Sequence, residues 1–200
     1  PTPTIGMLGV VDDIEVQTTT MSFKEEGDVI ILLSPRDWIH RNDINGSEYL
    51  SVIHDLTAGD APHLLLSEEV DVQHTCYTLI KEGYIRGAHD VSDGGLATCL
   101  AECSIASETL GANVQLTATK NTRLDAVLFG EAQSRIVLTV EPRHLESLRA
   151  ITDENGVSAT RLGIVTEGTL VITVDGIKAV NLAREKMSTV YNRAIPAYMN

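Results

Sequence analysis

The amino-acid sequence predicts an α+β fold in which a mixed β-sheet is layered with helices. Three observations support this fold class. Short aliphatic runs alternate with segments of helical periodicity, but without the strict βαβ alternation of a parallel α/β protein. Aromatic residues make up only 4% of the 200 residues, so the core must consist mainly of Val, Ile, Leu and Ala. After Arg135 the predicted order is strand, helix, strand, strand, which is partly ferredoxin-like.

The chain is expected to form one domain, residues 14–200, preceded by a stub or linker from a neighbouring domain, residues 1–13. Pro1 and Pro3 make the beginning of the chain stiff and extended. The stretch Ile14–Met21 fits an edge strand or a loop. Because the chain begins with Pro1 rather than Met, we expect it to be a fragment of a longer polypeptide.

The first half of the chain contains two predicted strands and three predicted helices. Val29–Leu33 is a continuous aliphatic run and predicts a strand buried on both faces. One helical pattern begins at Gly46-Ser47 and continues to Leu56. A second has Ser67 as its expected N-cap and ends at Gly83. The remaining elements are an extended piece over Ile85–Asp90 and a helix that follows Asp93-Gly94-Gly95 and ends before Gly111.

The second half of the chain contains four predicted strands and two predicted helices. Pro142 indicates the start of one helix, which Asn155-Gly156 ends. Asp175-Gly176 is a strong turn signal. The last helix is expected to run from near Asn181 to about Arg193. The predicted strands are Val114–Ala118, Arg135–Val140, Thr160–Val165 and Thr169–Val174.

Composition excludes some classes of partner. The net charge of −13 argues against a nucleic-acid partner, since phosphate-backbone binding needs a stripe of Lys and Arg. No apolar run approaches the roughly 20 residues of a membrane-spanning helix, so no membrane partner is expected. Three sparse cysteines indicate a reducing compartment and hence a cytoplasmic protein. Cys99 and Cys103 could present two metal ligands on a helix, but we expect them to be buried small hydrophobic residues.

The segment His89–Gly95 combines carboxylates, a hydroxyl and two glycines at a predicted helix start. Glycines allow a ligand to approach the backbone, and a helix N-terminus presents unpaired N–H groups. Asp90 and Asp93 would suit such a site only if a metal or an amine offset their charge. The alternative is that Ser92 or Asp93 simply caps the following helix.

A second polar segment, Phe129–Arg135, lies immediately before a predicted strand. Functional groups concentrate at such element ends in α/β proteins. Glu131 could bind Mg²⁺, and Arg135 could bind a phosphate with two hydrogen bonds. The alternative is a polar loop with an arginine at the strand entry. A third segment is Gly46–Tyr49, which on its own indicates simply the start of a helix.

Taken in order, these motifs resemble the C-terminal part of the large subunit of phosphoribosylformylglycinamidine synthase. The wider superfamily includes aminoimidazole ribonucleotide synthase, selenophosphate synthetase, a hydrogenase maturation factor and thiamine-monophosphate kinase, all of which use ATP. The resemblance implies the α+β fold of the C-terminal domain of these proteins. It covers nearly the whole chain, through Pro1-Thr2-Pro3, Ile5-Gly6, Gly27-Asp28, Gly46-Ser47-Glu48-Tyr49, His89–Leu96, Leu100-Ala101-Glu102 and Leu128–Arg135.

The resemblance implies an ATP-dependent ligase of purine biosynthesis. In that reaction ATP phosphorylates the formyl-amide oxygen of formylglycinamide ribonucleotide, and ammonia derived from glutamine displaces the phosphate. By the resemblance, Asp93 and Gly130 match ATP-contacting positions, Glu131 matches a Mg²⁺ position, and Gln133 matches a substrate-contacting position. The residues themselves add further candidates for the site, namely Asp90, Gly94, Gly95 and Arg135.

The resemblance also implies that this chain holds only part of an active site. The catalytic His is expected in N-terminal domains of the same polypeptide, and the glutaminase that supplies ammonia is expected in another subunit or domain. We therefore expect no catalytic residue in these 200 residues and no synthase activity from them alone. Two alternatives stay open: another enzyme of the same fold, similar to aminoimidazole ribonucleotide synthase, or a non-catalytic scaffold or regulatory nucleotide-binding domain.

Overall fold

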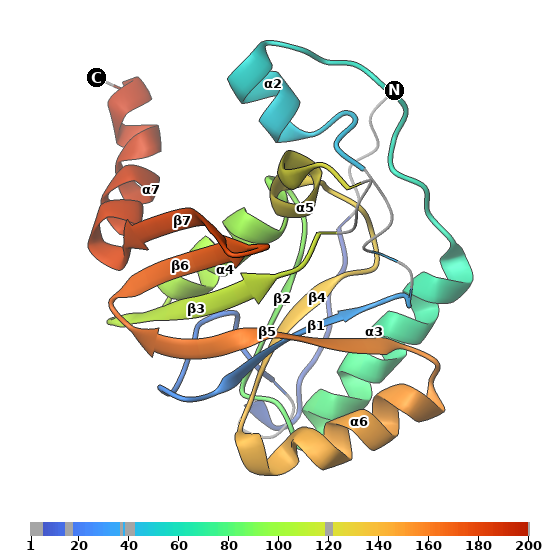
Figure 1. The fold of residues 1–200 in the computed structure, drawn as a ribbon. Helices are drawn as coiled ribbons and strands as arrows, with labels where there is room; N and C mark the ends of the chain where they lie inside the picture. Colours follow the sequence, from blue (N-terminus) through green and yellow to red (C-terminus); the bar gives the residue numbers. More distant parts are fainter. Residues whose placement is uncertain (1–5, 15–17, 37, 39–42, 119–121, 200) are drawn as a thin grey trace.

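The computed structural model describes residues 6–14, 18–36, 38, 43–118 and 122–199 (Figure 1). Within this part, seven strands form one sheet in the order β2-β4-β1-β5-β3-β6-β7. Neighbouring strands are antiparallel, except that β3 and β6 are parallel, so the predicted mixed sheet is confirmed. The strands are β1 Val29–Ser34, β2 Gly87–Asp90, β3 Leu110–Leu116, β4 Ile136–Val140, β5 Ser158–Glu167, β6 Thr169–Val174 and β7 Ile177–Ala183.

Strand β1 lies near the centre of the sheet, and all six of its residues are buried. It pairs antiparallel with β4 on one side and with β5 on the other. Because both neighbours run antiparallel to β1, they run parallel to each other with one strand between them. Helix α6 (Leu145–Glu154) connects β4 to β5, which makes a split βαβ unit. This arrangement is the partly ferredoxin-like feature that the sequence predicts.

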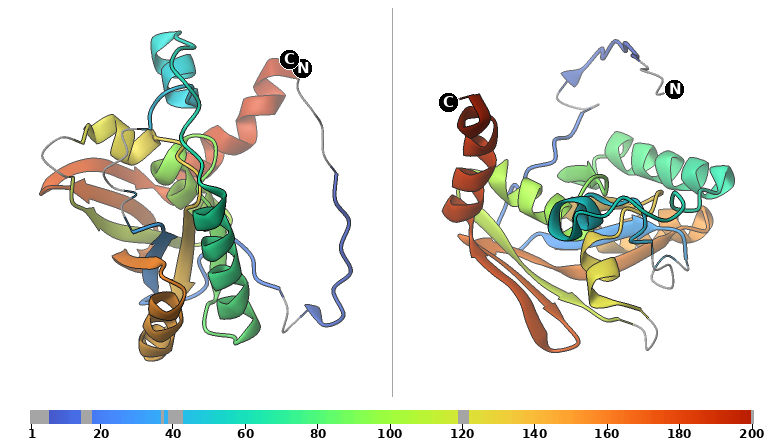
Figure 2. Two further views of the ribbon diagram at one scale, coloured as in Figure 1. Left: turned by 90° about the vertical axis from the view of Figure 1, so that its right-hand side faces the viewer. Right: turned by 90° about the horizontal axis from the view of Figure 1, so that it is seen from above.

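Helices cover both faces of the sheet, as Figure 2 shows. Successive residues of a strand point to opposite faces, so β1 contributes to two cores. Ile30 and Leu32 pack in a core with helix α4 (Gly95–Ile105), while Ile31 and Leu33 pack in a core with helix α3 (Leu66–Lys81). Helices α5 (Leu124–Phe129) and α7 (Arg184–Met199) add side chains to the α4 core, and α6 adds to the α3 core.

Helix boundaries in the first half differ slightly from the prediction. Helix α2 (Glu48–His54) is capped by Ser47, whose Oγ accepts a hydrogen bond from the Leu50 N–H, so the predicted start is correct. The helix ends at Asp55, which adopts φ 51°, and therefore does not reach Leu56. Ser67 is not an N-cap, because α3 already begins at Leu66 and has no side-chain cap. A 3₁₀ turn, Pro142–His144, precedes α6.

The predictions for the C-terminal part miss one strand. The last helix does not start near Asn181, which instead pairs with Val171 in the antiparallel β6–β7 hairpin. Asp175 and Gly176 both adopt positive φ in the turn, so they direct the chain back along β6 rather than into a helix. Helix α7 begins only at Arg184. Helix α5, six residues long, was not predicted because it is too short to show a helical period.

The N-terminal residues 6–14 are exposed and extend away from the domain (Figure 2). Residues 1–5 of the predicted stub, and with them the first motifs of the resemblance, lie outside the described residues. The boundary at residue 13 therefore stays a prediction. Among the described helices, none combines the length and the apolar character needed to cross a bilayer.

Candidate functional site

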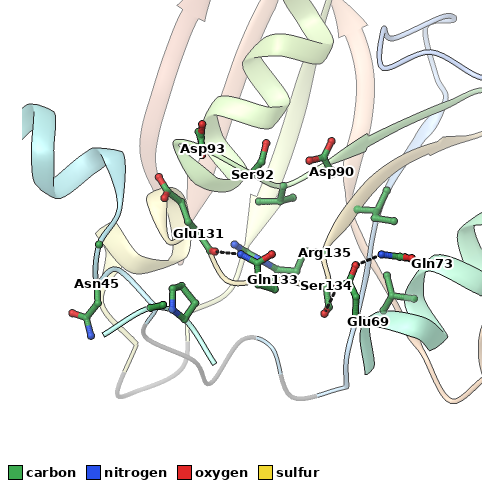
Figure 3. A pocket seen from close by; sticks show the side chains of 16 residues that line it. Asn45, Glu69, Gln73, Asp90, Ser92, Asp93, Glu131, Gln133, Ser134 and Arg135 are labelled. Carbon is green, nitrogen blue, oxygen red and sulfur yellow. Dashed lines mark hydrogen bonds between the residues drawn. The ribbon is translucent and has the colours of Figure 1, made fainter. Parts of the chain in front are cut away.

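A pocket of about 660 Å³ lies where β2 ends and β4 begins (Figure 3). Asp90, Asp93, Glu131, Gln133 and Arg135, which the sequence marks as candidates, all line this pocket. The other lining residues come from the 45–46 and 61–62 segments, from α3, from the loop after β2, and from the loop before β4 together with the first residue of β4. They are Asn45, Gly46, Ala61, Pro62, Glu69, Val72, Gln73, Val91, Ser92, Ser134 and Ile136.

The pairing of β2 with β4 brings the two main motifs together. The strands are antiparallel, with Asp90 opposite Ile136, so the end of β2 and the beginning of β4 meet at one edge of the sheet. The Val91 N–H donates to the Arg135 carbonyl at 2.9 Å and continues the pairing past the strand ends. The loop after β2 and the loop before β4 therefore lie side by side, although about 40 residues separate them in the sequence.

Two glycines form the start of α4 directly after Asp93; neither of them lines the pocket itself. Gly94 is the N-cap with φ 77°, and Gly95 follows with φ 69°, conformations that favour glycine. A Cβ atom on Gly95 would lie 2.6 Å from the Phe129 carbonyl carbon and 2.7 Å from the Gly130 oxygen. Glycine therefore lets the helix start touch the other loop. The alternative that the side chain of Ser92 or Asp93 caps α4 is wrong, because the N-cap is Gly94, which has no side chain.

The carboxylate of Glu131 joins three segments of the site. Its Oε1 atom accepts a hydrogen bond from the Gly94 N–H at 2.8 Å and another from the Glu48 N–H at 2.9 Å. The Glu131 N–H in turn donates to the Asp43 carbonyl at 3.1 Å. The Gly46–Tyr49 motif thus reaches the pocket through its contact with Glu131 and does more than begin a helix.

Gly130 and Arg135 stabilise the loop before β4 through buried contacts. Gly130 is buried, and a Cβ atom there would lie 2.5 Å from the Ala126 oxygen. Arg135 is 4% exposed and donates from Nη2 to the Gly130 carbonyl at 2.6 Å and from Nε to the Ala132 carbonyl at 3.0 Å. Its guanidinium also lies 5.6 Å from the centre of the Trp38 ring. These contacts fit a loop-holding role, and phosphate binding by Arg135 stays a prediction.

The charge of the pocket is dominated by carboxylates. Glu69, Asp90, Asp93 and Glu131 line it together with one guanidinium, that of Arg135. No group of three or more acidic, His or Cys side chains among the described residues is arranged to hold a metal ion. Mg²⁺ commonly uses only one or two protein carboxylates and completes its shell with water and phosphate oxygens. The carboxylates of the pocket, Glu131 among them, are therefore of the kind that a phosphate-bound Mg²⁺ ion can use.

The sequence reasoning missed the contribution of α3. Glu69 accepts a hydrogen bond from Ser134 Oγ at 2.6 Å and another from Gln73 Nε2. From the sequence, Glu69 is explained simply as a favourable charge in the first turn of α3. The spacing of Glu69 and Gln73 is the sequence signal for their contact, because residues i and i+4 share one face of a helix. Ser134 adopts φ 62°, a positive value that is uncommon outside glycine.

Glu102 and the cysteines lie outside the pocket lining. Glu102 bonds His89 Nε2 at 2.9 Å and so joins α4 to β2. The prediction that Cys99 and Cys103 are buried is confirmed, and Cys76 is buried as well. A hydrogen bond with Cys103, together with burial, raises the pKa of Cys99, and burial raises the pKa of Cys76 to about 11. Both thiols therefore stay protonated and serve in packing.

The chain is similar to known proteins over nearly its whole length. Residues 25–175 match the family described as "AIR synthase related protein, C-terminal domain". A protein of Salinibacter ruber named phosphoribosylformylglycinamidine synthase subunit PurL is 54% identical over 98% of this chain. A protein of Alkaliphilus metalliredigens with the same name is 38% identical over all of it. The chain covers 26% of each relative, so it spans about a quarter of their length.

Solved structures with the same fold include enzymes bound to ligands. A Thermotoga maritima PurL complexed with FGAR aligns with 86% of this chain at a TM-score of 0.69 and 19% identity, over 29% of its own length. The same protein complexed with ATP aligns with 86% of the chain at a TM-score of 0.64 and 12% identity, over 27% of its length. At these identities the likeness shows a shared fold.

Proposed function

Because the chain belongs to the AIR synthase related family, whose C-terminal domain it carries, we propose that it forms one wall of the ATP site of a phosphoribosylformylglycinamidine synthase. The observation that carries this proposal is the convergence of Asp93, Glu131 and Gln133 in one pocket. The segments that line the pocket include parts of the three motifs on which the resemblance rests, at Gly46, Asp90–Asp93 and Glu131–Arg135. Relatives that share 38–54% of the aligned residues bear the name of this synthase.

The proposed reaction is the ATP-dependent amidation of formylglycinamide ribonucleotide. ATP phosphorylates the formyl-amide oxygen, ammonia from glutamine attacks the activated carbon, and inorganic phosphate leaves. Overall, ATP becomes ADP and phosphate, and an amidine replaces the amide. This makes the full-length protein a cytoplasmic ligase of purine biosynthesis, and the free thiols of the chain agree with a reducing compartment.

Each proposed site residue has a role that its position supports. Asp93 is exposed at the pocket wall and can accept hydrogen bonds from the nucleotide. Gly130 holds the loop close to α5, and Gln133 offers an exposed amide to the ribonucleotide. Glu131 would contribute a carboxylate oxygen to Mg²⁺, which when bound neutralises phosphate charge. Asp90 adds a second carboxylate at the same wall, since 72% of its side chain is exposed.

The proposal requires further domains. The described lining of the pocket includes no histidine, and by the resemblance a catalytic His is expected from N-terminal domains of the same polypeptide. A glutaminase subunit or domain must supply ammonia. A solved structure of PurLQS from Thermotoga maritima aligns with 85% of this chain at 14% identity. The 200-residue chain alone is therefore expected to bind ATP weakly and to have no synthase activity.

The test compares the 200-residue chain with the full-length polypeptide. We expect glutamine- or ammonia-dependent formation of the amidine only with the full-length protein. Calorimetry with ATP and Mg²⁺ should give at least tenfold weaker affinity for the 200-residue chain. Turnover by that chain alone, or equal ATP affinity for both proteins, would contradict the shared-site proposal. Growth of purine auxotrophs blocked at each step separates this enzyme from an aminoimidazole ribonucleotide synthase.

A variant of Asp93 tests the pocket itself. In the full-length protein, Asp93→Asn should raise the KM for ATP roughly tenfold, because it removes the charge from one accepted hydrogen bond. Glu146→Ala is the matched control, since Glu146 is an exposed carboxylate at the far end of the domain on α6. An unchanged KM for ATP in the Asp93 variant would remove this residue from the nucleotide site.

A further inference from the structure

Glu131 lies where the loop before β4 meets the starts of α2 and α4. Its side chain reaches across from the loop before β4 to the start of α2 and to the start of α4. Both hydrogen bonds end on the same oxygen, Oε1. The Oε2 atom receives no hydrogen bond from the described residues. The two oxygens of one carboxylate are therefore in different situations.

The two N–H groups that Glu131 binds would otherwise lack a partner within their own helices. The first N–H groups of an α-helix have no intrahelical acceptor. Glu48 is the first residue of α2, and Ser47 Oγ already accepts from Leu50 rather than from Glu48. Gly94 is the N-cap of α4, where no side chain of the helix itself provides a cap. Glu131 therefore satisfies one such donor on each of two helices.

Helix α2 depends strongly on this contact because it packs loosely. None of its residues is buried, and Val52 is 73% exposed. Among the described residues, Tyr49 also attaches α2 to the α5 region by stacking on Phe129, with ring centres 4.7 Å apart. The segment after α2 supplies Ala61 and Pro62 to the pocket. The position of α2 therefore influences one side of the pocket.

We propose that Glu131 is a positioning residue that fixes the starts of α2 and α4 through Oε1 and so shapes the pocket before any ligand binds. This inference rests on the proposed function in one respect, namely that the shaped pocket receives the nucleotide. The role assigned to Oε1 is separate from metal binding, which would use Oε2. A single residue thus links the Gly46–Glu48, Gly94-Gly95 and Gly130–Arg135 segments.

The roles can be separated because they need different properties of the side chain. Accepting two N–H bonds needs an oxygen at the right reach, and Glu131→Gln keeps that oxygen while it removes the charge. Metal binding needs the negative charge, which Glu131→Asp keeps while it shortens the side chain by one methylene. Glu131→Ala removes both properties. Positioning therefore predicts that Gln substitutes well and Asp poorly, whereas a purely electrostatic role predicts the reverse order.

The experiment is amide hydrogen exchange measured by NMR on the 200-residue chain without ligand. In Glu131→Ala and Glu131→Asp, the amides of Glu48 and Gly94 should exchange about tenfold faster than in the parent protein. In Glu131→Gln they should stay within about threefold of it. The Ala118 amide, which donates to the Asp175 carboxylate at 3.2 Å, is the internal control and should not change. Glu146→Ala is the control variant.

The outcomes separate this inference from the proposed function. Unchanged exchange of Glu48 and Gly94 in Glu131→Ala would overturn the positioning role, as would equal loss of protection in the Gln variant. Neither result depends on ATP. In the full-length protein, Glu131→Gln should raise the Mg²⁺ concentration needed for half-maximal turnover while the KM for the ribonucleotide stays the same. A protein that keeps the predicted exchange pattern but lacks ATP-dependent turnover would refute the function alone.

Discussion

Replacing Gly95 with alanine tests whether the contact between the start of α4 and the 129–130 backbone builds the pocket. The conformation itself is one source of cost, because a left-handed φ of 69° costs a non-glycine residue about 1–2 kcal/mol. The contact is a second source. An added Cβ atom would lie 2.6 Å from the Phe129 carbonyl carbon, and overpacking of this kind costs typically about 1–3 kcal/mol. The sum is a loss of roughly 2–5 kcal/mol in the free energy of unfolding.

Gly156 provides a matched control for this substitution. It has the same φ of 69°, but an added Cβ atom would meet nothing within 4 Å. Gly156→Ala should therefore lose only the conformational part, about 1–2 kcal/mol. Any gain from a less flexible unfolded chain is similar for both variants and cancels in their difference. The difference between the two variants measures the contact alone.

Thermal and urea unfolding measure both variants. For a chain of this size each 1 kcal/mol shifts Tm by roughly 2–4 °C, so Gly95→Ala should lower Tm by about 4–20 °C and Gly156→Ala by about 2–8 °C. Linear extrapolation of the urea data gives the free energies independently. If Gly95→Ala is no less stable than Gly156→Ala, the contact between Gly95 and the Phe129–Gly130 backbone does not constrain the start of α4, and the reasoning is wrong.

Three other substitutions have expected outcomes. Burial raises the pKa of Asp28 even though Arg86 lies 3.5 Å from its carboxylate, so the folded chain binds a proton more readily than the unfolded chain and loses stability as pH rises. Asp28→Asn should therefore stabilise the fold at pH 7 in urea unfolding, and unfolding at pH 3–4 should show no gain. Arg135→Lys should lower the free energy of unfolding by about 1–3 kcal/mol in urea titrations, since an ammonium cannot reproduce the two-carbonyl fork. Tyr49→Ala should speed amide exchange throughout α2, and unchanged exchange would show that its stacking on Phe129 is dispensable.

Much of the fold could be predicted from local pattern. The Val29–Leu33 run is so uniformly aliphatic that only a doubly buried strand accommodates it, and all of these residues are buried in the structure. Strand β6 has the predicted bounds, Thr169–Val174. Strand β7 was missed because Asn181 and its neighbours are mostly exposed and show no apolar alternation. Pairing with β6 decides the structure there, and tertiary contacts of this kind leave little trace in local sequence.

The candidate site could be predicted only as separate motifs. The sequence marks Asp93 and Glu131 but contains no information about which strands pair, so their meeting in one pocket follows from the structure. The hydrogen bonds of Glu131 to the Gly94 and Glu48 N–H groups likewise follow only from the structure, because these partners are 37 and 83 residues away in the sequence. Glu69 lies in the first turn of α3, where the helix dipole alone accounts for an acidic side chain, so the sequence gives no reason to place it in the site. Side chains with an adequate local explanation are the ones that such reasoning overlooks.

The insertion of β4 between β2 and β1 has a consequence for how the chain folds. Residues 136–140 separate two strands that precede them by more than 45 residues, so the sheet cannot close until β4 has been synthesised. Closing loops of that length makes the contacts non-local and slows folding. A nascent chain that ends at residue 130 would leave both edges of β1 unpaired, because its partners β4 and β5 have not yet been made. We expect its dependence on chaperones to fall sharply once β4 and β5 are available.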